Sequence, residues 1–261
     1  MIVRAAAAGL DAIALTDHDT VAGIAEAAAA LPPGLALISG MELSCRRDGH
    51  SVHLLGYLFD PEHGELAEQC RAIRQSRVER ARAMVGKLAE LGTGVTWEQV
   101  TAIAGDGVIG RPHIARAMIE AGVVGSVDEA FTPRWIGPGG RAHVRRYAPD
   151  PADAIALVHA AGGVTVLAHP LAVTRGWIVP EELIAELALA GLDGVEVSHP
   201  DHDEAQRNQL TAVARRLGLA ETGGSDDHGQ LTGDRIGCET TGQDDLDRLL
   251  GRASGAAVIS R

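Results

Sequence analysis

The sequence has few aromatic residues and few cysteines, and each shortage narrows the possible classes of protein. Phe, Trp and Tyr together make up 3% of the 261 residues, so the core must be built mainly from Ala, Val, Leu and Ile. The three cysteines, Cys45, Cys70 and Cys238, are odd in number and far apart in the chain. They predict neither a disulfide framework nor a paired-cysteine zinc site, and they favour a reducing cytoplasm.

Long apolar runs are also missing. No stretch reaches the roughly 18 consecutive apolar residues that a membrane-spanning helix requires. The apolar segment 1–15 contains Asp11 and leads directly into Thr16-Asp17-His18-Asp19, without the cleavage site of a signal peptide. We therefore expect no membrane partner.

Positive charge is scarce and unevenly distributed. The formal net charge of −12 argues against an extended, non-specific nucleic-acid surface. Residues 71–147 nevertheless hold 12 Lys or Arg against 7 Asp or Glu, whereas the rest of the chain holds 11 against 28. We infer an acidic body suited to metal ions and a basic segment suited to an anionic substrate.

The sequence is rich in short apolar runs that end abruptly in polar clusters, with Ala- and Leu-rich amphipathic stretches between them. Strand, polar tip and helix in alternation indicate a parallel α/β barrel, in which functional groups lie at the carboxyl ends of the strands. The predicted strands are residues 12–15, 35–38, 52–58, 164–168, 194–197 and 219–222, and the predicted helices between them are residues 20–31, 151–161, 180–190 and 203–217.

Residues 62–147 interrupt this alternation. The stretch 65–91 predicts one long helix, and residues 96–121 predict a helical segment with a turn at 105–112. We therefore expect a barrel interrupted by a mostly helical insertion. The barrel would comprise residues 1–61 and 148–261, and the insertion would comprise residues 62–147.

Histidines and carboxylates gather at the ends of the predicted strands or within them. These two ligand types together suit Mn²⁺, Fe²⁺ or Zn²⁺ at a site that keeps one position open for water. Divalent ions in such a site can lower the pKa of water and stabilise charge on a phosphoryl oxygen. One histidine at a strand end is usually a packing or surface residue, but a whole set is hard to attribute to chance. The candidates are His18, Glu42, His53, His169, Asp226 and His228.

The order of several short motifs makes the chemistry more specific. The motifs are Thr16-Asp17-His18-Asp19-Thr20, Gly40-Met41-Glu42-Leu43-Ser44, Val52-His53-Leu54-Leu55-Gly56-Tyr57, Gly110-Arg111-Pro112-His113-Ile114-Ala115-Arg116, Ala168-His169-Pro170 and Gly224-Ser225-Asp226-Asp227-His228-Gly229. Over nearly the whole chain this ordered set resembles the PHP family (polymerase and histidinol phosphatase). It is most similar to the branch of 3′,5′-nucleoside bisphosphate phosphatases and 5′-3′ oligoribonucleases.

The resemblance implies a distorted (β/α)7 barrel with up to three divalent metal ions, Mn²⁺ first, with Fe²⁺ or Zn²⁺ as alternatives. Glu42 would bridge two metals, and His53 and His169 would complete one of those sites. A further metal would use His18 and His228, and Asp226 would occupy a third position beside Glu42. The catalytic residues would be Glu42, His169 and Asp226.

The resemblance also implies a substrate-binding set in the insertion. Arg111, His113 and Arg116 would bind the phosphates of the substrate, and bidentate arginine suits that task better than lysine. Arg111 and His113 could alternatively cap or orient the insertion. In the barrel, His199 is expected to contact the substrate.

One part of the family pattern has no counterpart. Family members carry an HxH pair on the first strand and an Asp a few residues later, ahead of the segment matched by residues 1–9. We therefore expect a barrel without its first strand, lacking two His ligands and one Asp ligand. The alternatives are a start codon assigned too late, which the intact remaining motifs favour, and a truly shortened chain.

The leading hypothesis is a cytoplasmic metal-dependent hydrolase. It would remove the 3′-phosphate of nucleoside 3′,5′-bisphosphates, such as adenosine 3′,5′-bisphosphate, or degrade short RNA from its 5′ end. Its partners would be these substrates. Two alternatives stay open: a phosphatase for a small metabolite of the histidinol phosphate type, and an inactive remnant that binds nucleotide or metal.

Overall fold

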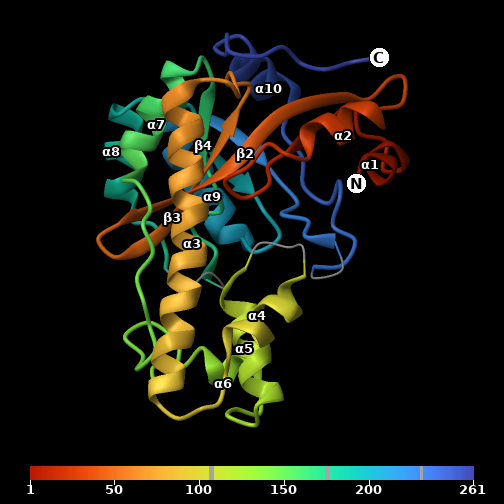
Figure 1. Cartoon of the computed structure of the whole chain (residues 1–261). Helices are drawn as coiled ribbons and strands as arrows, with labels where there is room; N and C mark the ends of the chain where they lie inside the picture. The colour runs from red at the N-terminus through yellow and green to blue at the C-terminus, as the bar shows by residue number, and fades with distance from the viewer. Residues whose placement is uncertain (106–108, 174–176, 230–231) are drawn as a thin grey trace. The chain divides into compact units, whose positions relative to one another are not determined.

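The computed structural model describes residues 1–105, 109–173, 177–229 and 232–261 (Figure 1). These residues form two compact units, one of Met1–Cys70 with Ala148–Arg261 and one of Arg71–Tyr147. The insertion boundaries inferred from the sequence, at residues 62–147, stay a prediction. Within the described part of the chain, no helix combines the length and the apolar character needed to cross a membrane.

The first unit is built on a mixed sheet of six strands in the order β1-β2-β3-β4-β5-β6. The α/β class is confirmed, whereas the seven-stranded barrel stays a prediction. Strand β3 runs antiparallel to β2 and β4, and the other neighbouring pairs are parallel. The strands are β1 (Ala12–Leu15), β2 (Ala36–Arg47), β3 (His50–Tyr57), β4 (Val164–Leu167), β5 (Gly194–Ser198) and β6 (Ala220–Gly223).

The expectation of an all-parallel arrangement is wrong for β2 and β3, which form a hairpin. Asp48 and Gly49 connect them with φ angles of 51° and 85°, and Arg47 pairs with His50. Positive φ at both central positions defines a type I′ turn, which Asp-Gly favours. The hairpin extends the strand predicted at 35–38 to residue 47, so Glu42 lies within a strand and not after its end.

Alternation along this hairpin separates the hydrophobic core from a polar face. Met41, Leu43 and Cys45 of β2 are buried in the main hydrophobic core. Because neighbouring side chains in a strand point to opposite faces, Glu42 and Ser44 lie on the other face of β2. Both are nevertheless buried. A strand with one face in the core therefore brings a carboxylate into the protein interior.

Helices pack against this sheet, and local capping determines where several of them begin. Helix α7 (Pro151–Ala160) packs on β2, β3 and β4, and α9 (Glu204–Leu217) packs on β5 and β6. The side chains of Asp150 and Asp203 accept hydrogen bonds from the first turns of α7 and α9. The other helices of this unit are α1 (Ile2–Ala7), α2 (Ile24–Ala29), α8 (Glu181–Leu189), α10 (Gln243–Leu250) and the beginning of α3 (Gly64–Glu90).

The second unit is helical and has its own hydrophobic core. It contains the rest of α3 with α4 (Trp97–Ala104), α5 (Arg111–Glu120) and α6 (Val127–Ala130). The Thr96 hydroxyl accepts a hydrogen bond from the Gln99 N–H at the start of α4, as a capping box requires. Of the turn predicted at 105–112, residues 106–108 lie outside the described residues. The core side chains include Met84, Leu88, Ile114, Met118 and Ile136.

Asp193 joins three parts of the first unit. Its buried carboxylate accepts hydrogen bonds from the Thr165 N–H at 2.9 Å, from His159 Nε2 at 2.8 Å and from Arg252 at 2.9 Å. Burial alone would raise the pKa of Asp193, but the bond from His159 and then the bonds from Thr165 and Arg252 lower it below 3.8. The ionised form of Asp193 therefore stabilises the fold.

We expect Asp193→Ala to lower the free energy of unfolding by about 2–4 kcal/mol, because it leaves buried donors without an acceptor. The ionised carboxylate contributes fully above its unfolded-state pKa of about 3.9, and the contribution is lost as the pH falls through the lower folded-state pKa. The difference between wild type and variant should therefore shrink below about pH 4. Urea denaturation between about pH 3 and 7 measures this, with the exposed Asp11→Ala as control. Equal losses in both variants would contradict the assignment.

Candidate metal centre

A buried carboxylate, that of Glu42, lies among three histidines. Its Oε1 is 2.6 Å from His53 Nδ1 and 3.2 Å from His169 Nε2, and its Oε2 is 3.5 Å from His18 Nδ1. The histidines come from three places in the fold, since His53 lies on β3, His169 follows β4 and His18 follows β1. Glu42 is therefore the residue at which three separate segments of the sheet meet.

The charge state of Glu42 suits a metal ligand. Burial alone would raise its pKa, but the charge of His53 and the hydrogen bonds from His169 and His53 hold the pKa of Glu42 well below 4.5. The three atoms of Glu42, His53 and His169 lie 2.6–3.4 Å apart. Ligands about 2.1 Å from a common ion have separations of this size. The site therefore has the donor chemistry and the spacing for a divalent metal ion.

Histidine rings form a continuous series through the site. Neighbouring ring centroids are 5.2–6.1 Å apart. The series brings all four predicted metal-binding histidines together with the predicted substrate contact. Its order is His228, His18, His53, His169, His199 and His202.

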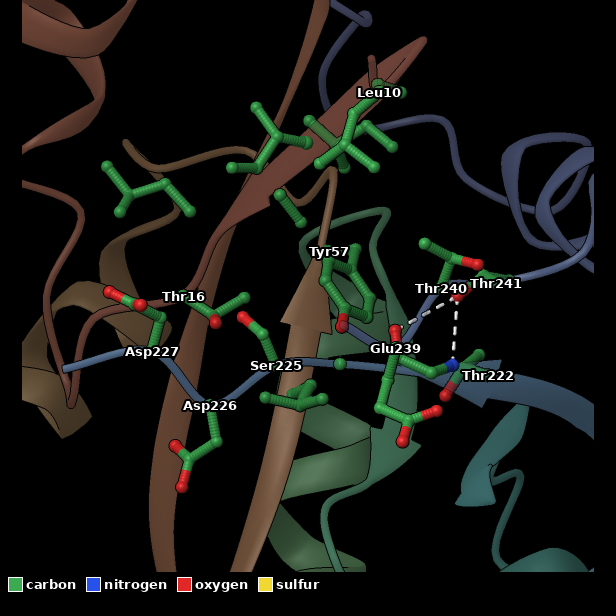
Figure 2. A pocket seen from close by; sticks show the side chains of 18 of the residues that line it. Leu10, Thr16, Tyr57, Thr222, Ser225, Asp226, Asp227, Glu239, Thr240 and Thr241 are labelled. Carbon is green, nitrogen blue, oxygen red and sulfur yellow. Dashed lines mark hydrogen bonds between the residues drawn. The ribbon is translucent and has the colours of Figure 1, made fainter. Parts of the chain in front are cut away.

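Asp226 and His228 join this group from the loop that follows β6. One oxygen of Asp226 is 3.4 Å from His228 Nδ1, and the other is 3.9 Å from His199 Nε2. All six predicted metal-binding residues are thus linked by short contacts, although their roles as ligands stay predictions. Figure 2 shows the side chains of Asp226 and Asp227 leaving this loop in different directions.

Asp227 anchors the loop that carries Asp226. Its carboxylate accepts hydrogen bonds from the N–H groups of Gly229 and Arg235 and from Arg4 on α1, at 2.8–3.0 Å. Burial acts to raise the pKa of Asp227, but Arg4 and the two N–H groups lower it to about 2. Its charge therefore fixes the loop to the first helix.

Asp19 fixes the segment that carries His18. Its fully buried carboxylate accepts hydrogen bonds from the Ser44 N–H at 2.7 Å and the Ser44 hydroxyl at 3.0 Å. Its own N–H donates to the Glu42 carbonyl at 3.1 Å. The sequence predicts no role for Asp19, although it lies beside His18 in the Thr16–Thr20 motif. The role of Asp19 depends on its hydrogen bonds to Ser44, and the sequence does not show that these two residues are neighbours in space.

Backbone strain is concentrated in the same place. Asp19, His169 and Asp226 have φ angles of 56°, 31° and 45°. Positive φ is unfavourable for residues with a side chain and persists where the surrounding contacts enforce it. Here it occurs at two predicted ligands and beside a third.

A cavity of about 900 Å³ opens onto the site. Its walls include His18, Glu42 and His169 together with residues of both β1 and β6. Figure 2 shows Thr16, Thr222 and Asp226 among the lining side chains. These two strands are the edges of the sheet in the part of the chain that the structure describes. The cavity could therefore admit a ligand directly to the predicted metal-binding residues.

His199 lies beneath this surface and is fully buried. Its Nδ1 accepts a hydrogen bond from the Asp201 N–H at 3.0 Å, so Nε2 carries the proton of the neutral ring. Nε2 faces Asp226. The substrate contact expected of His199 stays a prediction. His202 lies in the turn before α9, and its Nε2 accepts a hydrogen bond from the Leu171 N–H at 3.2 Å.

The three predicted phosphate-binding residues of the second unit lie near the beginning of α5. His113 Nδ1 accepts the Gly110 N–H at 3.0 Å and so caps the helix, and burial and the charge of Arg116 lower the pKa of His113. The guanidinium of Arg111 is 5.0 Å from the ring centroid of Phe131, and Arg116 is exposed. His113 therefore has a capping role, and phosphate binding by these residues stays a prediction.

Comparisons with known proteins identify similar chains, although no family model matches. A 5′-3′ exoribonuclease of Haemophilus influenzae is 35% identical over 231 residues, which cover 87% of this chain and 83% of the relative. A 3′,5′-nucleoside bisphosphate phosphatase of Chromobacterium violaceum is 34% identical over 237 residues, which cover 90% and 83%. A solved structure from Bifidobacterium adolescentis, described as a metal-dependent phosphoesterase, has a TM-score of 0.81 and 32% identity and covers 97% of this chain and 90% of its own.

We expect Glu42→Gln to weaken Mn²⁺ binding by a factor on the order of 100, because it removes the only charged ligand of the Glu42, His53 and His169 group. Isothermal titration calorimetry measures the affinity, and circular dichroism shows whether the variant folds. The exposed Glu62→Gln is the matched control and should bind as wild type. Undiminished Mn²⁺ binding by folded Glu42→Gln would rule out this metal centre.

Proposed function

Because this chain belongs to the PHP family of metal-dependent phosphoesterases, we propose that it hydrolyses phosphate esters of nucleotides. It would remove the 3′-phosphate of nucleoside 3′,5′-bisphosphates, degrade short RNA from its 5′ end, or do both. The observation that carries this proposal is the grouping of Glu42 with three histidines beside a large cavity. The substrates named for the two relatives support the substrate class.

Six side chains would hold the metal ions. Bound divalent ions would supply a water of lowered pKa and would neutralise charge on a phosphoryl oxygen. We propose Mn²⁺ first, with Fe²⁺ or Zn²⁺ as alternatives, and up to three ions, because mixed imidazole and carboxylate ligands suit all of these metals. The proposed ligands are His18, Glu42, His53, His169, Asp226 and His228.

The protein itself would contribute a site that is already ordered before the substrate arrives. Pairing of β2 with β3 fixes Glu42 relative to His53. The Asp19 clamp fixes the segment of His18, and the proton on His199 Nε2 faces the carboxylate of Asp226. Groups held in place in this way need no rearrangement when charge develops in the transition state. Catalysis would then depend on Glu42, His169 and Asp226.

The same proposal extends to the fold. The six strands would correspond to a distorted (β/α)7 barrel that lacks its first strand, with residues 62–147 inserted. Support comes from the two edge strands, β1 and β6, because both line the cavity and their outer edges have no strand partner among the described residues. A strand between them would close the barrel.

We also propose a cytoplasmic location. Cys238 is an exposed free thiol. Exposed thiols persist most readily in a reducing compartment, which supports the proposal.

Phosphate recognition would fall to Arg111, His113 and Arg116. All three lie in the first two turns of α5, where the helix dipole favours anions. The positive balance of residues 71–147, with 12 basic and 7 acidic side chains, supports the same role. In the first unit, His199, whose Nε2 lies 3.9 Å from Asp226, would contact the substrate.

We expect phosphate release from adenosine 3′,5′-bisphosphate in the presence of Mn²⁺, and Arg111→Ala and Arg116→Ala should each lower kcat/KM by about 10- to 100-fold. The exposed Arg141→Ala is the matched control. Colorimetric phosphate detection measures the rates, with histidinol phosphate as the small comparison substrate.

The outcomes separate the candidate functions. Full activity of Glu42→Gln would refute metal-dependent hydrolysis at this site. Faster turnover of histidinol phosphate, indifferent to both arginine substitutions, would favour the small-metabolite phosphatase. Nucleotide binding without turnover of any substrate would favour the binding remnant.

A further inference from the structure

Glu196 is a buried acidic residue beside the candidate metal centre that the proposed ligand set does not use. It lies on β5 and is 4% exposed. Its Oε2 accepts a hydrogen bond from the backbone N–H of His169 at 2.8 Å. Among the described residues, the group with ligand atoms close enough for a common ion is Glu42, His53 and His169, without Glu196. A role for Glu196 must therefore be sought in what it does to His169.

The hydrogen bond acts where the backbone is strained. Strand β4 ends at Leu167, the Ala168 N–H still bonds to the His53 carbonyl, and the chain then turns at His169 with φ of 31°. This turn takes the His169 N–H out of the sheet and towards Glu196. The same turn brings His169 Nε2 to 3.2 Å from Glu42. The backbone conformation and the direction of the imidazole are thus fixed together.

Gly224 adds an independent observation. A Cβ atom at this position would lie 2.3 Å from Glu196 Oε1, closer than any real contact permits. The φ of Gly224 is not in the left-handed region, so backbone conformation does not require glycine here. A side chain at this position would therefore displace the Glu196 carboxylate. Glu196 therefore packs between the turn that carries His169 and the loop that carries Asp226.

We propose that Glu196 is a positioning residue, which holds the strained backbone of His169 so that its imidazole faces Glu42. The absence of a side chain at Gly224 leaves room for the Glu196 carboxylate in this position. The inference rests on the proposed function only in treating His169 as a metal ligand. The hydrogen bond itself can be tested in protein from which metal has been removed.

The first experiment uses metal-free protein labelled with ¹⁵N at its 11 histidines. The His169 amide signal is identified by its loss in His169→Gln. Glu196→Leu removes the acceptor at similar side-chain size and should speed hydrogen exchange of this amide by about tenfold or more. Glu196→Gln keeps an acceptor oxygen and should stay within about threefold of wild type.

The second experiment measures Mn²⁺ affinity by calorimetry. Glu196→Leu should weaken it by about 10- to 100-fold, the usual effect of removing a group that orients a ligand, and Glu196→Gln should largely restore it. Gly224→Ala should behave like Glu196→Leu, because it displaces the same carboxylate. The double variant Glu196→Ala with Gly224→Ala should be no worse than Glu196→Ala alone, since the two changes act through one contact.

Wild-type exchange of the His169 amide in Glu196→Leu would overturn the proposal, whatever the metal affinity. Equal losses of amide protection and Mn²⁺ affinity in Glu196→Leu and Glu196→Gln would also overturn it. The charge of Glu196, and not the hydrogen bond to its oxygen, would then be responsible. If circular dichroism shows that Glu196→Leu does not fold, the same measurements of amide exchange and Mn²⁺ affinity are made on Gly224→Ala. Protection that depends on Glu196, in a protein that binds none of Mn²⁺, Fe²⁺ and Zn²⁺, would uphold the positioning role and refute the proposed function.

Discussion

A carboxylate that stays ionised inside a protein must be surrounded by donors, and this constraint organises the site. Glu42 lies in the interior, and histidines from three segments meet its two oxygens. Each of these segments has its own support. Asp19 holds the first segment, the hairpin holds the second, and Glu196 bonds to the turn of the third. Groups held in place in this way need no rearrangement when charge develops in a transition state.

Much of this arrangement could be predicted from the sequence, because short polar motifs follow apolar runs in a recognisable order. The strands at β1, β4, β5 and β6 lie within one residue of the expected positions, since each is bounded by a clear change from apolar to polar residues. The residues expected to bind metal are brought together, because they follow strands that neighbour one another or lie within them. The local pattern of apolar and polar residues is sufficient to predict the position of a site residue wherever that residue lies at the end of a strand.

The rest depended on contacts that no local pattern contains. The Asp-Gly pair at 48–49 is a strong hairpin signal, but the alternating α/β pattern around it favours a parallel arrangement. The predicted strand therefore ends at residue 38, before Glu42, whereas β2 continues to Arg47. The partnership of Asp19 with Ser44, and of Glu196 with the His169 N–H, joins residues far apart in the chain. The sequence allows either a capping or a phosphate-binding role for His113. The hydrogen bond from the Gly110 N–H to its Nδ1 shows the capping role.

The two faces of the β2–β3 hairpin make the length of strand β2 matter for the core and for the candidate site at once. Met41, Leu43 and Cys45 pack in the core, whereas Glu42 faces three histidines and Ser44 holds the carboxylate of Asp19. A single inserted or deleted residue would exchange the two sets along the rest of the strand. It would turn Glu42 towards the apolar core and an apolar side chain towards the histidines. The hairpin should therefore tolerate a changed side chain more readily than a changed length.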